Sequence, residues 1–276
     1  MTETLRLDGP ALKERARNIR RRILRMNAAA GQGHTGADLS ETDILTALYF
    51  RILGVHAGYP DDPLRDRFVL SKGHGVGGFY CMLAEAGLIE DSLLDQYLAF
   101  DSLTPGHPVR QKNRFIELNT GALGHGLPVS VGLALGAKRS GHGNRVFVLL
   151  GDGELQEGSN WEAAMTAAHY KLDNLVVIVD RNNLQLEDRT ETILAIEPLA
   201  DKWRAFGFAV HELDDGNDMD KIVACLEGLD HDGGRPHMVL AHTRKGNGVS
   251  FIADQPAWHH RVPTEEELSK ALEELN

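Results

Sequence analysis

The sequence predicts an α/β protein with a mostly parallel sheet and helices on both of its faces. Short apolar runs end in polar or glycine-rich turns, and helical patterns separate these runs along the chain. The clearest runs are RVFVLLGDG, NLVVIVDRNN and PHMVLAHTRKG. In such a sheet ligands bind beyond the carboxyl ends of the strands, and all three turns lie at those ends. We expect a single domain over residues 1–276.

Local patterns place the remaining elements. An N-terminal helical arm is predicted over about residues 10–30, and a second helix over about 39–51 with Ser40 and Asp43 as a capping pair. DRFVLSKGHG predicts a short strand that ends in a Ser-Lys-Gly-His turn, and residues from about 250 to 276 are expected to form an irregular tail. The apolar residues of the first helix recur at helical spacing: Leu12, Ala16, Ile19, Ile23 and Met26. Its arginines, between Arg15 and Arg25, indicate a solvated face or a subunit seam more than an anion site.

Composition limits the classes of function. A chain of 276 residues with 42% hydrophobic and 25% charged residues is typical of an ordinary soluble globular protein. The net charge of -11 argues against nucleic acid or an anionic membrane as the main partner, and the apolar runs are too short to span a bilayer. Two cysteines, Cys81 and Cys225, are too few for a disulfide framework or a zinc site. We therefore expect a cytoplasmic enzyme or enzyme subunit.

The turn Gly151-Asp152-Gly153 indicates the chemistry. Its glycines let the backbone turn tightly and let a ligand approach, while the following helix directs free N–H groups toward a phosphate. Because Asp152 and a phosphate would repel each other, a hard divalent cation (Mg²⁺, or Ca²⁺ or Mn²⁺) should bridge them. Asn182, at the end of the next predicted strand, and the backbone carbonyl of Leu184 can complete the ligands. A Gly-Asp-Gly turn alone is common at protein surfaces, and Asn182 is what favours a metal-bridged diphosphate.

Several motifs resemble those of a known family and occur in the same order along the chain. These are GQGHTGADLS, SKGHG, TPGHP, NTGALGHGLPVSVGLALGAK and GDGELQEGSNWEAA, followed by Asn182-Asn183. From about residue 18 to residue 263 the chain resembles the transketolase family. The resemblance implies the thiamine diphosphate-binding fold, of its diphosphate-binding (PP) type, with thiamine diphosphate and a divalent cation as cofactors. It also implies transfer of a two-carbon ketol unit from a ketose donor, phosphorylated or otherwise modified, to an aldose acceptor.

The resemblance assigns roles to individual residues. It implies that Asp152, Asn182 and the Leu184 carbonyl hold the metal ion. It implies that the cofactor contacts His74, Gly121, Ala122, Leu123, Gly153, Glu157, Asn182 and His259. His34, His107 and His259 would be the catalytic histidines of the substrate channel, since imidazole can bind sugar hydroxyls and move a proton near neutral pH. Of the two histidines in AWHH, His259 is favoured over His260 from its position relative to Pro263.

Other residues are open to two interpretations or match no motif. Glu157 is either a family acid in a network between active sites or a helix first-turn charge favoured by the dipole. Three departures from the family pattern, Thr35, Val109 and His125, are expected near the substrate channel and argue against ordinary pentose phosphates as substrates. The histidines that match no motif are interpreted as structural or surface residues: His56, His142, His169, His211, His231 and His237.

The resemblance also predicts a partner. A full transketolase carries two further domains, and the glutamate that activates the cofactor lies on one of them. We therefore expect the N-terminal subunit of a split transketolase, inactive alone and joined to a C-terminal subunit in an α2β2 assembly that acts on sugars. The arginine-rich first helix and LPVSVGLALGAK are candidate subunit surfaces. The alternatives are a related thiamine enzyme, such as a deoxyxylulose phosphate synthase or a 2-oxo acid dehydrogenase component, and a non-catalytic cofactor-binding scaffold subunit.

Overall fold

A five-stranded sheet in the order β1-β2-β3-β7-β6 forms the centre of the computed structural model, which describes residues 6–53, 60 and 62–276. Its strands are β1 (Arg67–Leu70), β2 (Val146–Gly151), β3 (Leu175–Asp180), β6 (Ala209–Leu213) and β7 (His237–Ala241). Every neighbouring pair is parallel. The predicted parallel α/β fold is confirmed, and the short strand predicted from DRFVLSKGHG is β1.

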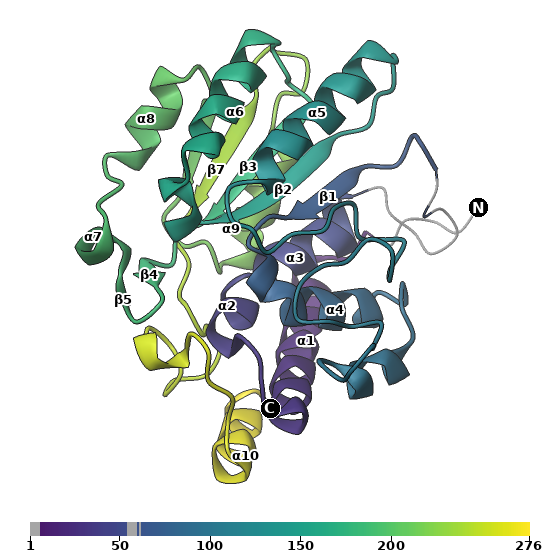
Figure 1. The fold of residues 1–276 in the computed structure, drawn as a ribbon, viewed down its shortest axis with the longest axis vertical. Coiled ribbons are helices and arrows are strands. Elements are labelled where there is room, and N and C mark those ends of the chain that lie inside the picture. The colour runs from purple at the N-terminus through teal and green to yellow at the C-terminus, as the bar shows by residue number, and fades with distance from the viewer. Residues whose placement is uncertain (1–5, 54–59, 61) are drawn as a thin grey trace.

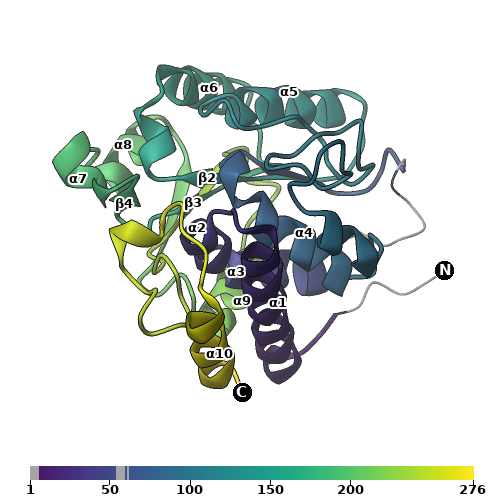
Figure 2. The ribbon, with the colours of Figure 1, turned by 60° about the horizontal axis from the view of Figure 1, so that its bottom comes forward.

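Helices cover both faces of the sheet, as Figures 1 and 2 show. One face carries α5 (Gly126–Arg139), α6 (Gly158–His169) and α8 (Leu199–Ala205), and the other carries α1 (Gly9–Ala30), α3 (Thr42–Ala47), α4 (Val76–Glu85) and α9 (Met219–Glu227). Residues of β2 alternate between the two cores, with Phe147 and Leu149 facing α1 and Val146, Val148 and Leu150 facing α5. Burial on both faces explains why these strands are continuous apolar runs in the sequence.

Short elements connect the larger ones. They are α2 (Thr35–Ser40), η1 (Leu48–Ile52), η2 (Gly73–Gly75), η3 (Asp91–Gln96), η4 (Gly153–Gln156), β4 (Leu184–Gln185), β5 (Asp188–Arg189), α7 (Thr190–Ile193), η5 (Pro256–Trp258) and α10 (Glu265–Glu274). Strands β4 and β5 pair as an antiparallel hairpin. Among the described residues, no helix combines the length and the apolar character needed to cross a membrane.

The first and the last helix, α1 and α10, pack onto the domain. Helix α1 forms where it was predicted, and its apolar face is part of the core beside α3 and α4. The C-terminal segment is not irregular throughout, because α10 begins at a capping box of Thr264 and Glu267 and packs against α1. Both terminal helices therefore contribute to one folded body.

The helix predicted over about 39–51 is divided into α2, α3 and the π-helical η1. The predicted capping pair is wrong, because both side chains have partners far away in the sequence. Ser40 donates its hydroxyl to the carboxylate of Asp180 at 2.6 Å, and Asp43 pairs with Arg20. Tertiary hydrogen bonds have replaced the local cap.

A buried ion pair joins α1 to α3. Nη1 of Arg20 lies 3.0 Å from Oδ1 of Asp43, and both side chains are less than a tenth exposed. The Asp43 carboxylate also accepts from Asn217 at 2.9 Å and Asn247 at 3.2 Å. The expected solvated face of α1 is thus wrong for Arg20, whose charge is buried and paired.

We predict that Asp43→Ala lowers the free energy of unfolding by about 3–5 kcal/mol, because it leaves the buried Arg20 without its counter-charge. The matched control is Asp201→Ala, which breaks an exposed pair with Arg204 and should cost less than about 1 kcal/mol. Urea titration followed by circular dichroism measures both. Equal losses in the two variants would contradict the structural role of the buried pair.

Candidate active site

The loops that follow β1, β2, β3 and β7 enclose a cavity of about 240 Å³ at the carboxyl ends of the strands. The side chains and backbone that line it include His34, Lys72, His74, His107, Gly121, Leu123, Asp152, Gly153, Glu154, Asn182, Leu184, Gln185, Leu186, Lys245 and His259. All the residues predicted for the site line this cavity except Ala122 and Glu157. The structure therefore brings together motifs that are spread over more than two hundred residues of sequence.

Asp152 lies directly after β2 and is buried. Its Oδ2 accepts three hydrogen bonds, from Nη1 of Arg181 at 2.9 Å, from the backbone N–H of Asn183 at 2.8 Å and from the hydroxyl of Thr190 at 3.2 Å. Its Oδ1 accepts from the backbone N–H of Gly153 at 2.8 Å. Burial raises the pKa of Asp152, and the Arg181 charge opposes that shift. One carboxylate oxygen is thus fully held, while Oδ1 retains acceptor capacity for a ligand.

The segment after β3 supplies two further oxygen atoms. Oδ1 of Asn182 accepts from the backbone N–H of Leu184 at 3.1 Å, and the Leu184 carbonyl accepts from Nζ of Lys245 at 3.3 Å. Among the described residues, no group of three or more His, Cys, Asp or Glu side chains is placed to hold a metal ion. A cation here would instead be held by one carboxylate, one amide oxygen and one carbonyl oxygen, a ligand set suited to Mg²⁺ or Ca²⁺.

Histidines form one wall of the cavity. The ring centroid of His34 lies 5.3 Å from that of His74, 5.5 Å from that of His259 and 4.6 Å from that of His260. Burial lowers the pKa of His34 to about 3 and that of His259 to about 4, and it holds the pKa of His74 well below its usual range. At neutral pH these three imidazoles are uncharged, so each can donate one hydrogen bond and accept another.

The position of His259 bears on the choice between the two adjacent histidines. Its ring lines the cavity, with Nδ1 at 2.8 Å from Nζ of Lys245. Both histidines line a neighbouring cleft of about 810 Å³, but His260 does not line the cavity itself. This arrangement favours His259 as the residue that reaches the cofactor and substrate, and its role stays a prediction.

Two glycines that line the cavity, Gly121 and Gly153, are closely packed against side chains of the same chain. Gly121 has a φ of 133°, and a Cβ there would lie 2.7 Å from Cδ2 of His107. A Cβ on Gly153 would meet the side chain of Gln185 at 2.8 Å. A side chain at either position would collide with its neighbours, so glycine is needed for His107 and Gln185 to pack against the backbone beside the cavity.

Sequence reasoning missed several charged residues of the cavity. Nζ of Lys72 lies 2.5 Å from Asp180 and 3.0 Å from Glu41, and burial lowers the pKa of Lys245 to about 8. Glu154 is also buried, and its carboxylate accepts hydrogen bonds from the hydroxyl of Ser71 and the N–H groups of Gly124 and Gly151. Both lysines lie in the turns that follow strands β1 and β7, in SKGH and TRKG, and that position could have indicated them.

Some predicted residues lie outside the cavity. Ala122 is exposed, and Glu157 is an exposed residue at the N-terminus of α6 without a side-chain capping bond, so both interpretations of Glu157 stay open. The three departures, Thr35, Val109 and His125, do not line the cavity either.

The histidines without motifs lie away from the site. His211, His231 and His237 form a separate group in which Nε2 of His211 lies 3.2 Å from Nδ1 of His237. His142 and His169 do not line the cavity, and His56 lies outside the described residues.

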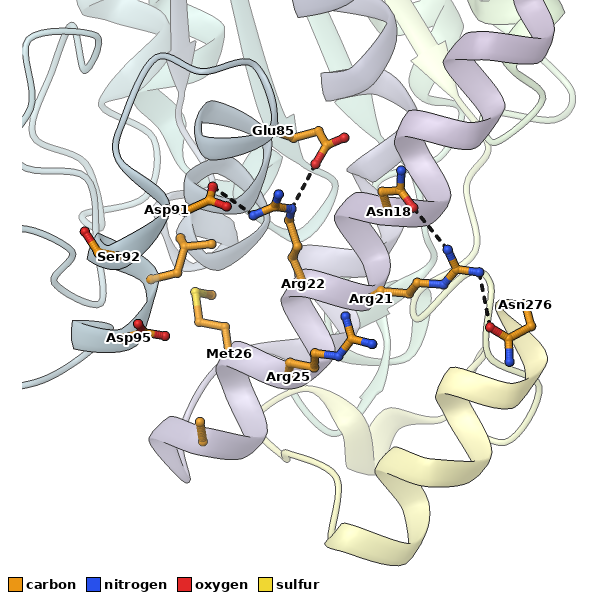
Figure 3. A pocket seen from close by; sticks show the side chains of 12 residues that line it. Asn18, Arg21, Arg22, Arg25, Met26, Glu85, Asp91, Ser92, Asp95 and Asn276 are labelled. Atoms are coloured by element: carbon orange, nitrogen blue, oxygen red, sulfur yellow. Dashed lines mark hydrogen bonds and ion pairs between the residues drawn. The ribbon is translucent and has the colours of Figure 1, made fainter.

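A wider hollow of about 1010 Å³ runs along α1, and Figure 3 shows the side chains that line it. Arg22 there bonds Glu85 at 2.8 Å and Asp91 at 2.9 Å, and Arg21 bonds Asn18 at 3.0 Å. These two arginines are engaged by groups of the same chain. Two of the carboxylates of the hollow, Glu85 and Asp91, are paired with Arg22, and its described lining contains no histidine, so the smaller cavity is the candidate site.

Comparison with known families gives one match over nearly the whole chain. The family model described as the thiamine diphosphate binding domain of transketolase matches residues 13–275. The chain is 55% identical over 265 residues to a relative from Actinobacillus succinogenes that is named as a subunit of apulose-4-phosphate transketolase, covering 96% of this chain and 95% of that one. It is 39% identical over 264 residues to the 6-deoxy-6-sulfo-D-fructose transketolase subunit SqwG of Clostridium sp. (strain MSTE9), covering 96% of each.

Solved structures give the same fold. The transketolase from Leishmania mexicana matches with a TM-score of 0.90 and 29% sequence identity, covering 96% of this chain and 41% of that one. The transketolase from Campylobacter jejuni matches with a TM-score of 0.88 and 31% identity, covering 98% of this chain and 43% of that one. The chain therefore spans less than half the length of these solved transketolases.

The neutral histidines predict a pH dependence of stability. Because the folded pKa of His34 and His259 lies below the ordinary value of 6.5, the unfolded chain binds more protons as the pH falls below 6.5. These two histidines therefore favour the folded state fully above about pH 6.5, and this stabilisation is lost as the pH falls toward 4. Burial raises the pKa of Asp38 to about 6 and that of Glu41 well above its usual range, which acts in the opposite direction.

The test therefore compares variants. We predict that His34→Gln/His259→Gln loses less stability between pH 7 and pH 4.5 than the unsubstituted chain, as measured by urea titration at each pH. A His142→Gln/His169→Gln control, away from the cavity, should follow the unsubstituted chain. If the two double variants show the same pH dependence, the cavity histidines are not the groups responsible.

Proposed function

The chain belongs to the transketolase family, and from this premise we propose that it is the N-terminal subunit of a split, thiamine diphosphate-dependent transketolase. With a C-terminal subunit it transfers a two-carbon ketol unit from a ketose donor to an aldose acceptor. The observation that carries the proposal is the cavity itself. It combines oxygen ligands for a hard cation, cationic groups for a diphosphate and neutral histidines for a sugar at the carboxyl ends of parallel strands.

The cavity residues fit thiamine diphosphate and a divalent cation. Asp152, Asn182 and the Leu184 carbonyl would hold the cation, while Gly153 and His74 would contact the diphosphate through N–H groups. The positive charge of Lys245 also favours an anion in this cavity, whereas that of Lys72 is already paired with Asp180 and Glu41. When bound, thiamine diphosphate supplies a group that stabilises a carbanion and carries the two-carbon fragment.

Apolar side chains at the cavity fit the uncharged part of the cofactor. Leu123 and Leu186 line the cavity, yet their side chains are 37% and 58% exposed. Exposed large apolar residues beside a polar cavity indicate a contact surface for a ligand or partner. We infer that both cover a ring of the cofactor, with Gly121 allowing its close approach.

Three histidines would serve the substrate. His34, His107 and His259 line the cavity, and burial lowers the pKa of each. A neutral imidazole donates one hydrogen bond and accepts another, so it can bind a sugar hydroxyl and accept its proton as a carbon–carbon bond breaks.

A partner is proposed because, among the described residues of the cavity, no carboxylate is left for the aminopyrimidine ring of the cofactor: Asp152 is the proposed metal ligand, and Glu154 is bonded by Ser71, Gly124 and Gly151. The described carboxylates that line it are Asp152 and Glu154, and both accept hydrogen bonds from their own chain. The glutamate that the family uses on the aminopyrimidine ring would therefore come from a C-terminal subunit. Relatives of similar length that are named as single subunits of a transketolase support a two-chain enzyme. We propose an α2β2 assembly, and a cytoplasmic location stays a prediction.

The outer face of α5 and α6 is the proposed subunit surface. Val129 and Met165 are 40% and 55% exposed, and a Cβ on Gly132 or Gly136 would meet nothing within 4 Å. A surface that is apolar and locally flat permits a close approach of another chain. One face of the LPVSVGLALGAK helix thus packs into the core, and the opposite face is exposed.

For the substrate we propose a modified ketose, with apulose 4-phosphate as the first candidate. The chain is 55% identical in sequence to the Actinobacillus succinogenes relative, whose name includes that sugar, and 34% identical to human transketolase. The departures at Thr35, Val109 and His125 agree with a substrate other than an ordinary pentose phosphate. Because these residues lie outside the cavity lining, any effect on specificity would act through its surroundings.

We predict that the complex copurified with its C-terminal subunit transfers a two-carbon unit from apulose 4-phosphate to an aldose phosphate when Mg²⁺ and thiamine diphosphate are present. The pure chain alone should show no transfer. Asp152→Ala should lower the rate by more than about 100-fold, beyond the loss typical of residues that only orient metal ligands. The exposed control Asp201→Ala should keep the rate.

Donor choice separates the alternatives in the same assay. Consumption of pyruvate or another 2-oxo acid with release of carbon dioxide would instead indicate a related thiamine enzyme. Cofactor binding without turnover of any ketose or 2-oxo acid would indicate a scaffold subunit. Robust transfer by the pure chain would overturn the need for a partner.

A further inference from the structure

Arg181 is a buried cation next to the candidate metal site that the proposed chemistry leaves unused. It follows β3 directly, and its side chain is 2% exposed. Its backbone is fixed to the neighbouring strand, because its N–H donates to the Ala241 carbonyl at 2.9 Å and its carbonyl accepts from Thr243 at 3.3 Å. A buried guanidinium on a rigid strand end has a well-defined direction, and here that direction is toward Asp152.

The guanidinium contacts acids on two sides. Nη1 donates to Oδ2 of Asp152 at 2.9 Å, while Nη2 donates to Glu191 and to Glu197, each at 2.8 Å. Glu191 is on α7 and Glu197 precedes α8. The planar fork of arginine therefore joins the end of β2 to the segment beyond the β4–β5 hairpin.

That segment, residues 183–197, carries cavity residues as well. It includes the Leu184 carbonyl, Gln185 and Leu186, and in Figure 1 it runs through β4, β5 and α7 at one side of the molecule. Two carboxylates of this segment accept further hydrogen bonds. Glu191 accepts from the N–H of Ile196 at 3.2 Å, and Glu197 accepts from the N–H of Leu199 at 2.7 Å. Holding these acids holds the whole segment against the cavity.

We propose that Arg181 is a positioning residue for the metal and its diphosphate. One end of its guanidinium fixes Oδ2 of Asp152, so that Oδ1 faces the cavity. The other end fixes residues 183–197, so that the Leu184 carbonyl is held at the same site. This inference rests on the proposed function and adds a residue that acts through the metal ligands without touching the metal ion.

The charges around Arg181 suit this role. A lone cation beside a metal site would repel the metal ion, but Glu191 and Glu197 balance the guanidinium. Lysine would keep the positive charge, yet its single ammonium cannot reproduce the fork that reaches acids on two sides. Arg181→Lys therefore separates geometry from charge.

The test measures Mn²⁺ binding to the copurified complex in the presence of thiamine diphosphate, by electron paramagnetic resonance of free Mn²⁺. We expect Arg181→Lys to raise the apparent Kd for Mn²⁺ by about 10- to 100-fold, the range typical when a group that orients metal ligands is lost. Saturating Mn²⁺ should restore cofactor binding. The matched control is Arg204→Lys, because Arg204 also pairs with two acids but is exposed, and it should change the Kd less than twofold.

A second readout follows the segment itself. Arg189 is exposed within residues 183–197 and is a site for trypsin. Cleavage after Arg189 should be faster in Arg181→Lys than in the unsubstituted complex, and saturating Mn²⁺ with thiamine diphosphate should slow it. If Arg181→Lys does not fold, the double variant Glu191→Gln/Glu197→Gln replaces it in both measurements. This variant should fold, because both glutamate side chains are more than a third exposed and the contact between Arg181 and Asp152 is kept.

The outcomes distinguish this inference from the proposed function. An unsubstituted complex that binds neither Mn²⁺ nor thiamine diphosphate would overturn the proposed function. An unsubstituted complex that binds both, with Arg181→Lys and Glu191→Gln/Glu197→Gln binding Mn²⁺ within twofold of it, would overturn the role of Arg181 alone.

Discussion

The buried carboxylate of Asp180 is the group on which the geometry of the site depends. It lies at the end of β3 and accepts from Lys72 after β1, from the hydroxyl of Thr243 after β7 and from Ser40 on α2. Burial alone would raise the pKa of Asp180, but Lys72 and the two hydroxyls hold it below its usual value. A permanent negative charge thus joins three strand ends and one helix. The segments that carry His74, Lys245 and His34 adjoin this junction, and Asp152 follows β2, which lies between β1 and β3, so the four side chains meet in one cavity.

The same junction explains how the cavity can be both buried and ready for an anion. Lys72, in the cavity wall, is paired with Asp180 and Glu41, while the histidines are kept uncharged by burial. A diphosphate and its cation would then enter a site whose own charges are already largely paired. Such preorganisation lowers the cost of binding, because few groups must reorient or change protonation. Arg181 is paired in a similar way in the loop beyond β3. The acids that balance its charge, Glu191 and Glu197, belong to the segment of residues 183–197 that it holds.

Much of this arrangement could be predicted from the sequence, because it depends on local patterns. Strands β2, β3 and β7 are apolar runs that end in motif turns, and the carboxyl ends of parallel strands must meet. Strand β6 was missed because its residues are only partly buried, as expected at a sheet edge, so its apolar pattern is weak. The capping role of Ser40 was wrong because its partner, Asp180, is 140 positions away. Glu154 and Arg181 could not be assigned for the same reason, since their roles follow from contacts that no short segment contains.

The central claim is that this cavity holds thiamine diphosphate and a divalent cation only as half of a two-chain enzyme. Native mass spectrometry of the complex, purified gently from its source with its bound small molecules released and weighed, tests that claim most directly. We expect a second chain of different mass in equal number, with one thiamine diphosphate and one divalent ion for each pair of chains. A homo-oligomer of this chain that carries no thiamine diphosphate, and takes up none when Mg²⁺ and the cofactor are supplied, would contradict it.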